Sequence, residues 1–582
     1  MLTECLEVFS HQLDEETDAL ILNSYIPADG TYIIVNHDGE IEYTMEMKMD
    51  KKTRQYDKSH PHFSEMCQYD YCSQLISMNK PMDAKKVIHS NSYLSFFVKK
   101  ESIAAGKLTE EIIDSYFDTL LNPAERKYKK SKEATRIYQR FAEQYGQVNP
   151  KEVESKREWI KKNIFSFSDI DMTKKDYLKI FFEEDAEVYE REGQRYFLPN
   201  IYNSNEYNIE IEGNACGLPD NNLGMNAKKP FLSIKTRKYP APYLLNSEDV
   251  LLQKKLFDYL MNLVSKGKYN IYVDTSEQKI IGCKNDEAPE KIETGYYLRL
   301  KKGKTEAEIH AQDNISGYMQ RLNPPFYFEN ILGVNHKYQS AYLKSYNISY
   351  DSRLKVGDLI NEVIFSKWLK SNYGLDVGDI NISDGILKQN IVLSRDIVFD
   401  WVYKGRNHGF HNVMNHVALS MARHSVVNGY VERASWQLNL LYSLKKYFSG
   451  EGEEDMAEIS SNLKASIESR VLGECKDPLE NDSQYYYAVG QLAAFLISLN
   501  KSKEKKQSLI NPFLNATSNQ NIRLRIMQIF KKYNYAIQEN SKRVKRMLEL
   551  VEGYEPNGAV DQEKILLGYV CENVIYYTKE EK

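Results

Sequence analysis

The hydrophobic pattern of this chain changes its period near residue 352. Before that point, short apolar runs are bounded by turn residues, which is typical of strands mixed with helices. After it, apolar residues recur every three or four positions, which predicts helices. A chain of 582 residues is also too long for one ordinary core. We therefore predict an α+β protein, with a mixed α/β domain over 1–352 and an all-α helical bundle over 353–582.

The predicted elements follow from local patterns. We expect three β-hairpins in the first domain, at Thr31–Met47 (with Asp38-Gly39 at its turn), Lys268–Cys283 and Gly295–Ala311, the last turning near Gly303. Residues 108–180 are charged and helical in pattern. In the second domain, helical spacing predicts one helix over Ser483–Leu499 and a last helix with apolar residues from Leu567 to Tyr577.

Composition narrows the class of protein. The chain has no apolar run of about 18 residues, so we expect no membrane span. Its first residues carry acids where a signal peptide would be basic and then apolar, which favours a cytoplasmic protein. The seven cysteines are scattered and odd in number, which does not suggest a disulfide framework. The net charge of −5 argues weakly against a nucleic-acid binder, but local charge matters more than the sum.

Catalytic signatures are missing from the sequence. We find no phosphate-binding loop, no HExxH zinc helix and no GxSxG elbow. Two groups of possible metal ligands are His60, His62, Cys67 and Cys72, and then His408, His411, His416 and His424. The first has irregular spacing for a zinc site, and the second has no carboxylate nearby in sequence to orient it. We expect no enzyme, no cofactor and no metal site, and a metal-dependent nuclease using the second group is the alternative.

A loop with cations and amides lies at Asn221–Leu245. It contains no acid, and it opens with glycine, proline and asparagine residues that favour a loop. Cations neutralise phosphates, and asparagine side chains can donate and accept hydrogen bonds at base edges. A turn followed by a solvated basic strand fits the same residues. The candidate DNA-binding residues are Asn222, Asn226, Lys228, Lys229, Lys235 and Arg237.

A second basic segment lies at Lys501–Leu550. It holds twelve basic and three acidic residues, a net charge of +9 in an acidic chain. Like charges at this density repel one another unless a polyanion neutralises them, although a solvated helix face is the simpler reading. The candidate strand-binding residues here are Lys531, Lys532, Arg543 and Arg546.

Several segments resemble one known family. The stretch MNKP…KK.IHSN.YLSFF within Tyr69–Lys100, the pattern NN…N.KKPF…KTRK within Asn214–Lys238, and the terminal LLGYV at Leu566–Val570 are similar to the large subunit of type I-B CRISPR interference complexes, of the Haloarcula subtype. The matches keep their order along nearly the whole chain.

The resemblance implies a function that composition cannot give. Such a subunit lies at the 5′ end of the guide RNA, beside the subunit that caps the RNA handle, and in one complex with backbone and small subunits. It recognises a short motif that flanks the target in duplex DNA, helps to open the R-loop, and docks a separate helicase-nuclease. A purely structural assembly subunit, with cations bound only to RNA or to a partner, is a further alternative.

The same resemblance implies that the end of the bundle is similar to a separate small subunit. Residues Gly450–Asp455 read Gly-Glu-Gly-Glu-Glu-Asp, and Met456 follows. The codons of these residues make the message before Met456 almost wholly purine, which resembles a bacterial ribosome-binding site. Initiation there would give residues 456–582 as a second product. An acidic, flexible loop between two helices is the simpler reading of the same residues.

Overall fold

The computed structural model describes residues 2–50, 52, 56–202, 208–211, 214–220, 244–302, 307–334, 345–449, 456–500 and 507–576. The chain divides into two compact units, Met1–Ser316 and Gly317–Lys582. Secondary structure changes character at a different place. The last described strand ends at Ser352, and a helix begins at Arg353. The predicted α+β class, with sheets in the N-terminal part and helices in the C-terminal part, is confirmed.

The first sheet of unit 1 has the strand order β2-β1-β4-β3. Its strands are β1 (Gly30–Val35), β2 (Ile41–Met47), β3 (Ser95–Lys99) and β4 (Tyr177–Phe182). The predicted hairpin is confirmed, because β1 and β2 pair as antiparallel strands. Its turn is stabilised locally: Gly39 adopts a φ of +80°, and the Asn36 side chain accepts from the amides of Asp38 and Glu40. β1 also pairs in parallel with β4, so the helical connection between them crosses over the sheet.

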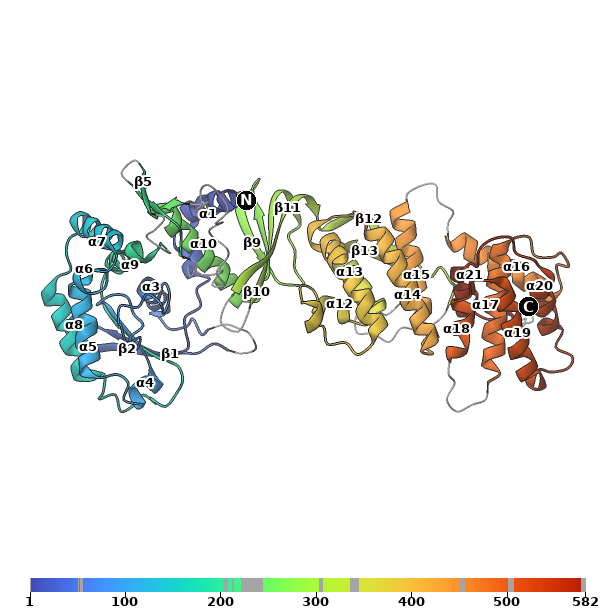
Figure 1. Ribbon diagram of the computed structural model, residues 1–582, viewed down its shortest axis with the longest axis horizontal. Helices are drawn as coiled ribbons and strands as arrows, with labels where there is room; N and C mark the ends of the chain where they lie inside the picture. Colours follow the sequence, from blue (N-terminus) through green and yellow to red (C-terminus); the bar gives the residue numbers. More distant parts are fainter. Residues whose placement is uncertain are drawn as a thin grey trace. The chain divides into compact units, whose positions relative to one another are not determined.

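Helices surround this sheet in Figure 1. The helices that complete this core are α3 (Phe63–Ser73), α4 (Lys100–Ala104), α5 (Glu110–Leu121), α6 (Pro123–Arg126), α7 (Lys132–Tyr145), α8 (Pro150–Asn163) and α9 (Ala186–Asn200). One continuous cluster of buried side chains joins the strands to α3, α5, α8 and α9, whereas Ala124 of α6 and Ala134 and Tyr138 of α7 pack in a small cluster with Tyr128. The prediction that 108–180 is largely helical is confirmed by α5 to α8.

The second sheet has the order β11-β10-β8-β9. Its strands are β8 (Asn270–Asp274), β9 (Lys279–Cys283), β10 (Lys291–Lys302) and β11 (Ala307–Met319). Helices α1 (Leu2–Glu16), α2 (Ala19–Leu22) and α10 (Ser247–Ser265) share an apolar core with it. Both hairpins predicted here are confirmed, and the turn near Gly303 lies outside the described residues.

A third, short sheet completes unit 1. It contains β5 (Ile209–Ile211), β6 (Asn214–Gly217) and β7 (Leu245–Asn246), all antiparallel. β7 leads directly into α10, where the Asn246 side chain accepts from the amide of Asp249 and caps the helix. This small sheet is the part of the fold from which the predicted basic loop departs.

Unit 2 begins with the strand pair β12 (Arg321–Phe328) and β13 (Ile348–Ser352). The longer helices that follow are α11 (Arg353–Val363), α13 (Gly385–Lys404), α14 (Phe410–Val427), α15 (Val431–Ser449), α16 (Met456–Leu472), α17 (Asp482–Ser498), α19 (Asn519–Tyr533), α20 (Lys542–Gly553) and α21 (Gln562–Val570). Two short helices, α12 and α18, cover Trp368–Ser371 and Asn511–Leu514. Figure 1 shows α16, α17, α19, α20 and α21 gathered in one bundle.

The two predicted bundle helices have different outcomes. Helix α17 lies within one residue of the prediction, and it packs against α21 so closely that a Cβ on Gly490 would lie 2.2 Å from the carbonyl oxygen of Ile565. The last helix is shorter than predicted, because α21 ends at Val570. The reason is Gln491 of α17, whose side chain donates to the Gly568 carbonyl at 2.6 Å and accepts from the Val574 amide at 2.9 Å.

Two further findings concern disulfides and membrane spans. All seven cysteines are free. Within the described ranges, no helix is long and apolar enough to cross a membrane.

Candidate nucleic-acid interface

The ten candidate residues fall into two groups. Asn222, Asn226, Lys228, Lys229, Lys235 and Arg237 lie outside the described residues, whereas both ends of their segment are described. Lys531, Lys532, Arg543 and Arg546 lie on helices α19 and α20 of unit 2. The two groups belong to different compact units, and each has its own surroundings.

Both ends of the basic loop are attached to the same small sheet. Strand β6 precedes the loop and β7 follows it, and the two are antiparallel neighbours in which Gly217 pairs with Leu245 and Cys216 pairs with Asn246. Paired residues in antiparallel strands lie about 5 Å apart. The loop therefore starts and finishes at adjacent points of a hydrogen-bonded base.

An ion pair fixes the start of the loop. The Asp220 carboxylate, whose side chain is 2% exposed, contacts the Lys80 ammonium. Lys80 also donates to the carbonyl oxygens of Asn200 (2.5 Å) and Tyr202 (2.7 Å), and the Asp220 amide donates to the Ile201 carbonyl at 2.7 Å. Burial lowers the pKa of Lys80, and the charge of Asp220 opposes that shift. Lys80 belongs to the MNKP stretch, and Asp220 lies within Asn214–Lys238, directly before the NN…KKPF pattern, so two segments that resemble the family meet here although they are 140 residues apart in sequence.

A second lysine, Lys127, lies close to this ion pair. Lys127 donates to the carbonyl oxygen of Pro81, and its ammonium lies 5.7 Å and 5.9 Å from the ring centroids of Tyr128 and Tyr196. Burial lowers the pKa of Lys127 to about 8, and repulsion from Lys80 adds to the shift. Tyr196 in turn donates to the carbonyl oxygen of Lys80 at 2.7 Å. The base of the loop is thus a buried polar network with two ammonium groups and one carboxylate.

The two candidate cations that are exposed are lysines at the end of α19. Lys531 and Lys532 are both exposed, and α19 contains no acidic residue. The Lys532 ammonium lies 5.2 Å from the ring centroid of Tyr533. Tyr535, which follows the helix, is 74% exposed. An exposed aromatic ring beside cations suits single-stranded nucleic acid, which combines phosphates with bases that stack.

The two arginines of α20 are engaged inside the bundle. Arg546 donates to the carbonyl oxygens of Leu472 (2.6 Å) and Val471 (3.2 Å), and so it caps the C-terminus of α16. The next residue, Gly473, has a φ of +84°, and a Cβ there would lie 2.3 Å from the Arg546 guanidinium. Arg543 donates to the carbonyl oxygen of Ile575 at 3.4 Å. The four candidates therefore divide into two exposed lysines and two half-buried arginines.

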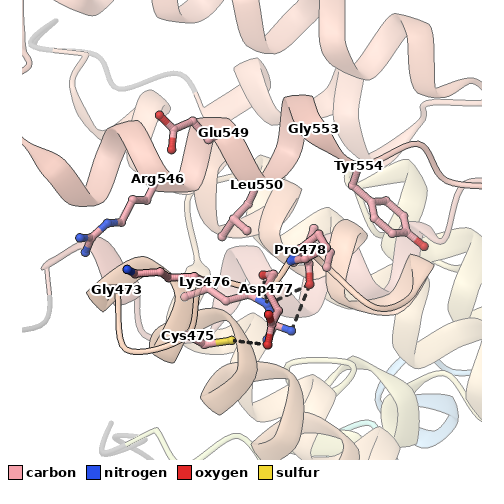
Figure 2. Close-up of a pocket in the computed structure, with 12 residues that line it drawn as sticks. Gly473, Cys475, Lys476, Asp477, Pro478, Arg546, Glu549, Leu550, Gly553 and Tyr554 are labelled. Carbon is pink, nitrogen blue, oxygen red and sulfur yellow. Dashed lines mark hydrogen bonds between the residues drawn. The ribbon is translucent and has the colours of Figure 1, made fainter.

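Arg546 also lines a pocket of about 380 Å³ between α20 and the loop that follows α16 (Figure 2). In that view Leu550 points from α20 toward the loop residues Asp477 and Pro478. Arg470 in its wall bonds to the carbonyl oxygens of Asp477 and Pro478 and pairs with Glu480 at 2.6 Å. These polar contacts hold the loop against α16, so we assign the pocket a structural role.

The candidate metal ligands are dispersed. His424 pairs with Asp384 at 2.6 Å, a carboxylate 40 residues earlier that the local sequence pattern could not reveal. His411 contacts Asn415 at 2.9 Å, and His408 and His416 are exposed. Among the described residues, no three His, Cys, Asp or Glu side chains are placed to hold a metal ion.

In the first candidate ligand group, the ring centroids of His60 and His62 lie 6.0 Å apart. His62 pairs with Glu65 at 2.7 Å, in the first turn of α3. Cys67 and Cys72 lie further along the same helix, and burial raises the pKa of both thiols to about 12.

Sequence reasoning missed one group of charges beside the loop base. Lys129, Lys130 and Lys132 are exposed around the N-terminus of α7, next to the buried Lys127. The signal was present in the sequence, because residues 126–140 hold seven basic residues and one acid.

In comparisons with known proteins, no family model matches the chain, and no curated protein matches it.

Proposed function

We propose that this chain is the non-catalytic large subunit of a type I-B CRISPR RNA-guided DNA surveillance complex. It recognises the motif that flanks the target in duplex DNA, promotes R-loop formation and helps to recruit a helicase-nuclease. Its other partners are the guide RNA and the backbone, handle-capping and small subunits, in the cytoplasm. In this division of labour, base pairing selects the target, and the protein reads only the flanking motif and nucleic-acid geometry.

The observation that carries the proposal is the base of the basic loop. A segment with several cations and asparagines and no acid emerges from two paired strands, and an ion pair fixes Asp220, the residue directly before it. Sites that read nucleic acid need side chains held on a rigid support. The lysine of that ion pair comes from the other motif that resembles the family, which gives the MNKP lysine a physical role.

The experiment is DNA binding by the assembled complex with loop variants. Lys228→Ala with Lys229→Ala removes two phosphate contacts, so it lowers the salt dependence of binding by roughly one unit of slope per contact. Asn222→Ala or Asn226→Ala relaxes discrimination between flanking motifs, by about 1–3 kcal/mol for a bidentate contact. If the complex assembles and neither pair of variants alters DNA binding, the loop is structural and its assignment as the DNA-reading site is wrong.

The alternative activity has its own measurement. We expect the purified chain to leave single- and double-stranded DNA intact in the presence of magnesium, manganese or zinc. Cleavage that disappears in His411→Ala or His416→Ala would contradict a purely binding role.

A further inference from the structure

The most basic described stretch of unit 1 is 126–140, with seven basic residues and one acid. Two of its arginines, Arg126 and Arg136, have carboxylate partners. Arg126 pairs with Asp118 at 2.9 Å, and Arg136 pairs with Glu133 at 2.7 Å and with Glu210 at 2.6 Å. Asp118, Glu133 and Glu210 are therefore occupied by guanidinium groups, whereas Glu125, directly before the stretch, is an exposed carboxylate.

Three lysines remain exposed in the same stretch. We call Lys129, Lys130 and Lys132 the lysine patch. They lie on either side of Ser131, whose hydroxyl accepts from the Ala134 amide at 3.1 Å and caps α7. The Ser131 amide donates to the Tyr128 carbonyl at 2.8 Å, so a hydrogen-bonded turn holds the backbone of the patch.

The lysine patch is attached to the base of the basic loop. Asn200 donates from its side chain to the Tyr128 hydroxyl at 2.8 Å, and the Asn200 carbonyl accepts from Lys80, the partner of Asp220. On the other side, Arg136 reaches Glu210 of β5, the strand paired with β6. The turn that carries the patch and the strands that carry the loop thus share one network of polar contacts.

The chemistry of the patch favours a phosphate backbone over a protein partner. Protein interfaces are centred on buried aromatic or aliphatic anchors. In the described stretch 122–144, no large apolar side chain is exposed, and the nearest exposed ones along these elements are Tyr145 at the end of α7 and Ile209 and Ile211 of β5. The patch itself therefore consists of charged side chains without an apolar anchor among them. An ammonium group is a compact point charge on a flexible stem, which suits phosphates at varied positions.

From these observations we propose that the lysine patch binds the phosphate backbone of duplex DNA, next to the place where the basic loop leaves its sheet. This inference rests on the proposed function, and it deepens it by adding a phosphate-contact surface to the same DNA site. The patch contributes affinity that is independent of sequence, whereas the amides of the loop contribute discrimination.

The test uses the purified full-length chain and a fluorescent 25-base-pair duplex at several salt concentrations. The patch variant is Lys129→Ala, Lys130→Ala and Lys132→Ala together. The control variant removes the same charge from the second sheet, with Lys279→Ala, Lys284→Ala and Lys302→Ala, all exposed. Because each lost phosphate contact removes about 0.9 from the slope of log K against log salt, we expect the patch variant to lose at least one unit. The control keeps the wild-type slope, and replacing the three patch lysines with arginine restores it.

The outcomes separate this inference from the proposed function. If the patch variant keeps the wild-type slope while Lys228→Ala with Lys229→Ala lowers it, the lysine patch does not bind DNA and the proposed function stands. If the patch variant lowers the slope and the loop variant does not, the lysine patch binds DNA and the assignment of the loop is wrong. If both keep it, or the wild-type chain does not bind the duplex, both ideas are wrong. A patch variant that binds duplex normally but loses a single-stranded RNA would assign the patch to RNA and overturn the proposal.

Discussion

The loop base of unit 1 and the end of the bundle in unit 2 are both rich in basic residues, but they use them differently. At the loop base the two half-buried cations are lysines, with Lys80 on a carboxylate and Lys127 on a backbone carbonyl. Among the four candidates in the bundle, the half-buried cations are the arginines Arg543 and Arg546 on backbone carbonyls, and the exposed ones are Lys531 and Lys532. An arginine has five donors in a fixed fork, so one side chain can satisfy two carbonyls at a helix end.

This difference teaches that a local charge count mixes two kinds of residue. Arg546 contributes one of the positive charges in the +9 segment, yet its guanidinium is part of the packing between α16 and α20. Lys531 contributes the same charge and is exposed. Only residues of the second kind are free to contact a polyanion without a cost to the fold.

The largest expected effect is a second product from the same gene. Met456 is the first residue of α16, so an internal start there would begin at a helix. Residues 456–582 would retain the close packing of α17 on α21, where a Cβ on Gly568 would lie 2.1 Å from the Tyr487 carbonyl oxygen. This shared core predicts that the 127-residue product folds alone as a small bundle. Expression of the native gene with a C-terminal tag should therefore yield a full-length band and a short one.

The matched variant for this prediction is Met456→Leu. It removes the start codon and keeps an apolar helix former at the same position. We expect the short band to vanish and the full-length band to remain. If the short band persists in the variant, it does not arise from a start at Met456. If the native gene yields no short band, no internal start is used.

The next effect is a loss of stability in unit 1 when the ion pair at the loop base is broken. Lys80→Ala leaves the buried Asp220 carboxylate without its ammonium, which typically costs about 3 kcal/mol or more. For a unit of this size that corresponds to about 5 °C in unfolding temperature, measurable by calorimetry. The double variant Lys80→Met with Asp220→Asn leaves no unpaired charge, and we expect it to recover at least half of the loss.

The same variants also test whether the pair positions the loop. If Lys80→Ala weakens duplex binding and the double variant restores it, stability and loop position are linked. Unchanged DNA affinity in a destabilised Lys80→Ala protein would mean that the ion pair supports the fold only.

The comparison within the bundle gives a smaller effect. Arg546→Ala removes the cap on α16, and hydrogen bonds from a charged donor are typically worth about 2 kcal/mol. Lys531→Glu with Lys532→Glu should lower the unfolding temperature less than Arg546→Ala does, because both side chains are exposed and a charge in the last turn of a helix is worth only about 0.3–1 kcal/mol. The exposed pair should instead weaken R-loop retention about equally for all targets. An effect that differs between flanking motifs, or a stability loss in the lysine variant larger than that of Arg546→Ala, would contradict this assignment.

The sequence predicted the elements better than the contacts. Hairpins with a clear turn, such as the one at Asp38-Gly39, depend on local chemistry and were found. The end of the last helix depends on Gln491, which lies about 80 residues away, so no local pattern announces it. The same holds for the site. Local charge predicted the basic loop and the basic segment of the bundle. The Lys80–Asp220 ion pair could not be predicted, because its two residues are far apart in sequence and meet only in the folded chain.

The smallest effect concerns Lys127 and depends on pH. Burial lowers its pKa from 10.5 to about 8, so between these values the unfolded chain binds more protons than the folded one. Stability from this group therefore rises with pH across that window, and below pH 8 the folded state carries the full cost of a charged, buried ammonium. Lys127→Met removes that cost together with the bond to the Pro81 carbonyl, and we expect a net gain of about 1–2 kcal/mol at pH 7. The gain should shrink as the pH approaches 10, whereas Lys129→Met, an exposed neighbour, should change stability at neither pH. Denaturant unfolding of the three proteins at pH 7 and pH 10 measures this difference. A gain that does not change with pH would mean that packing, rather than the charge of Lys127, limits the stability of the loop base.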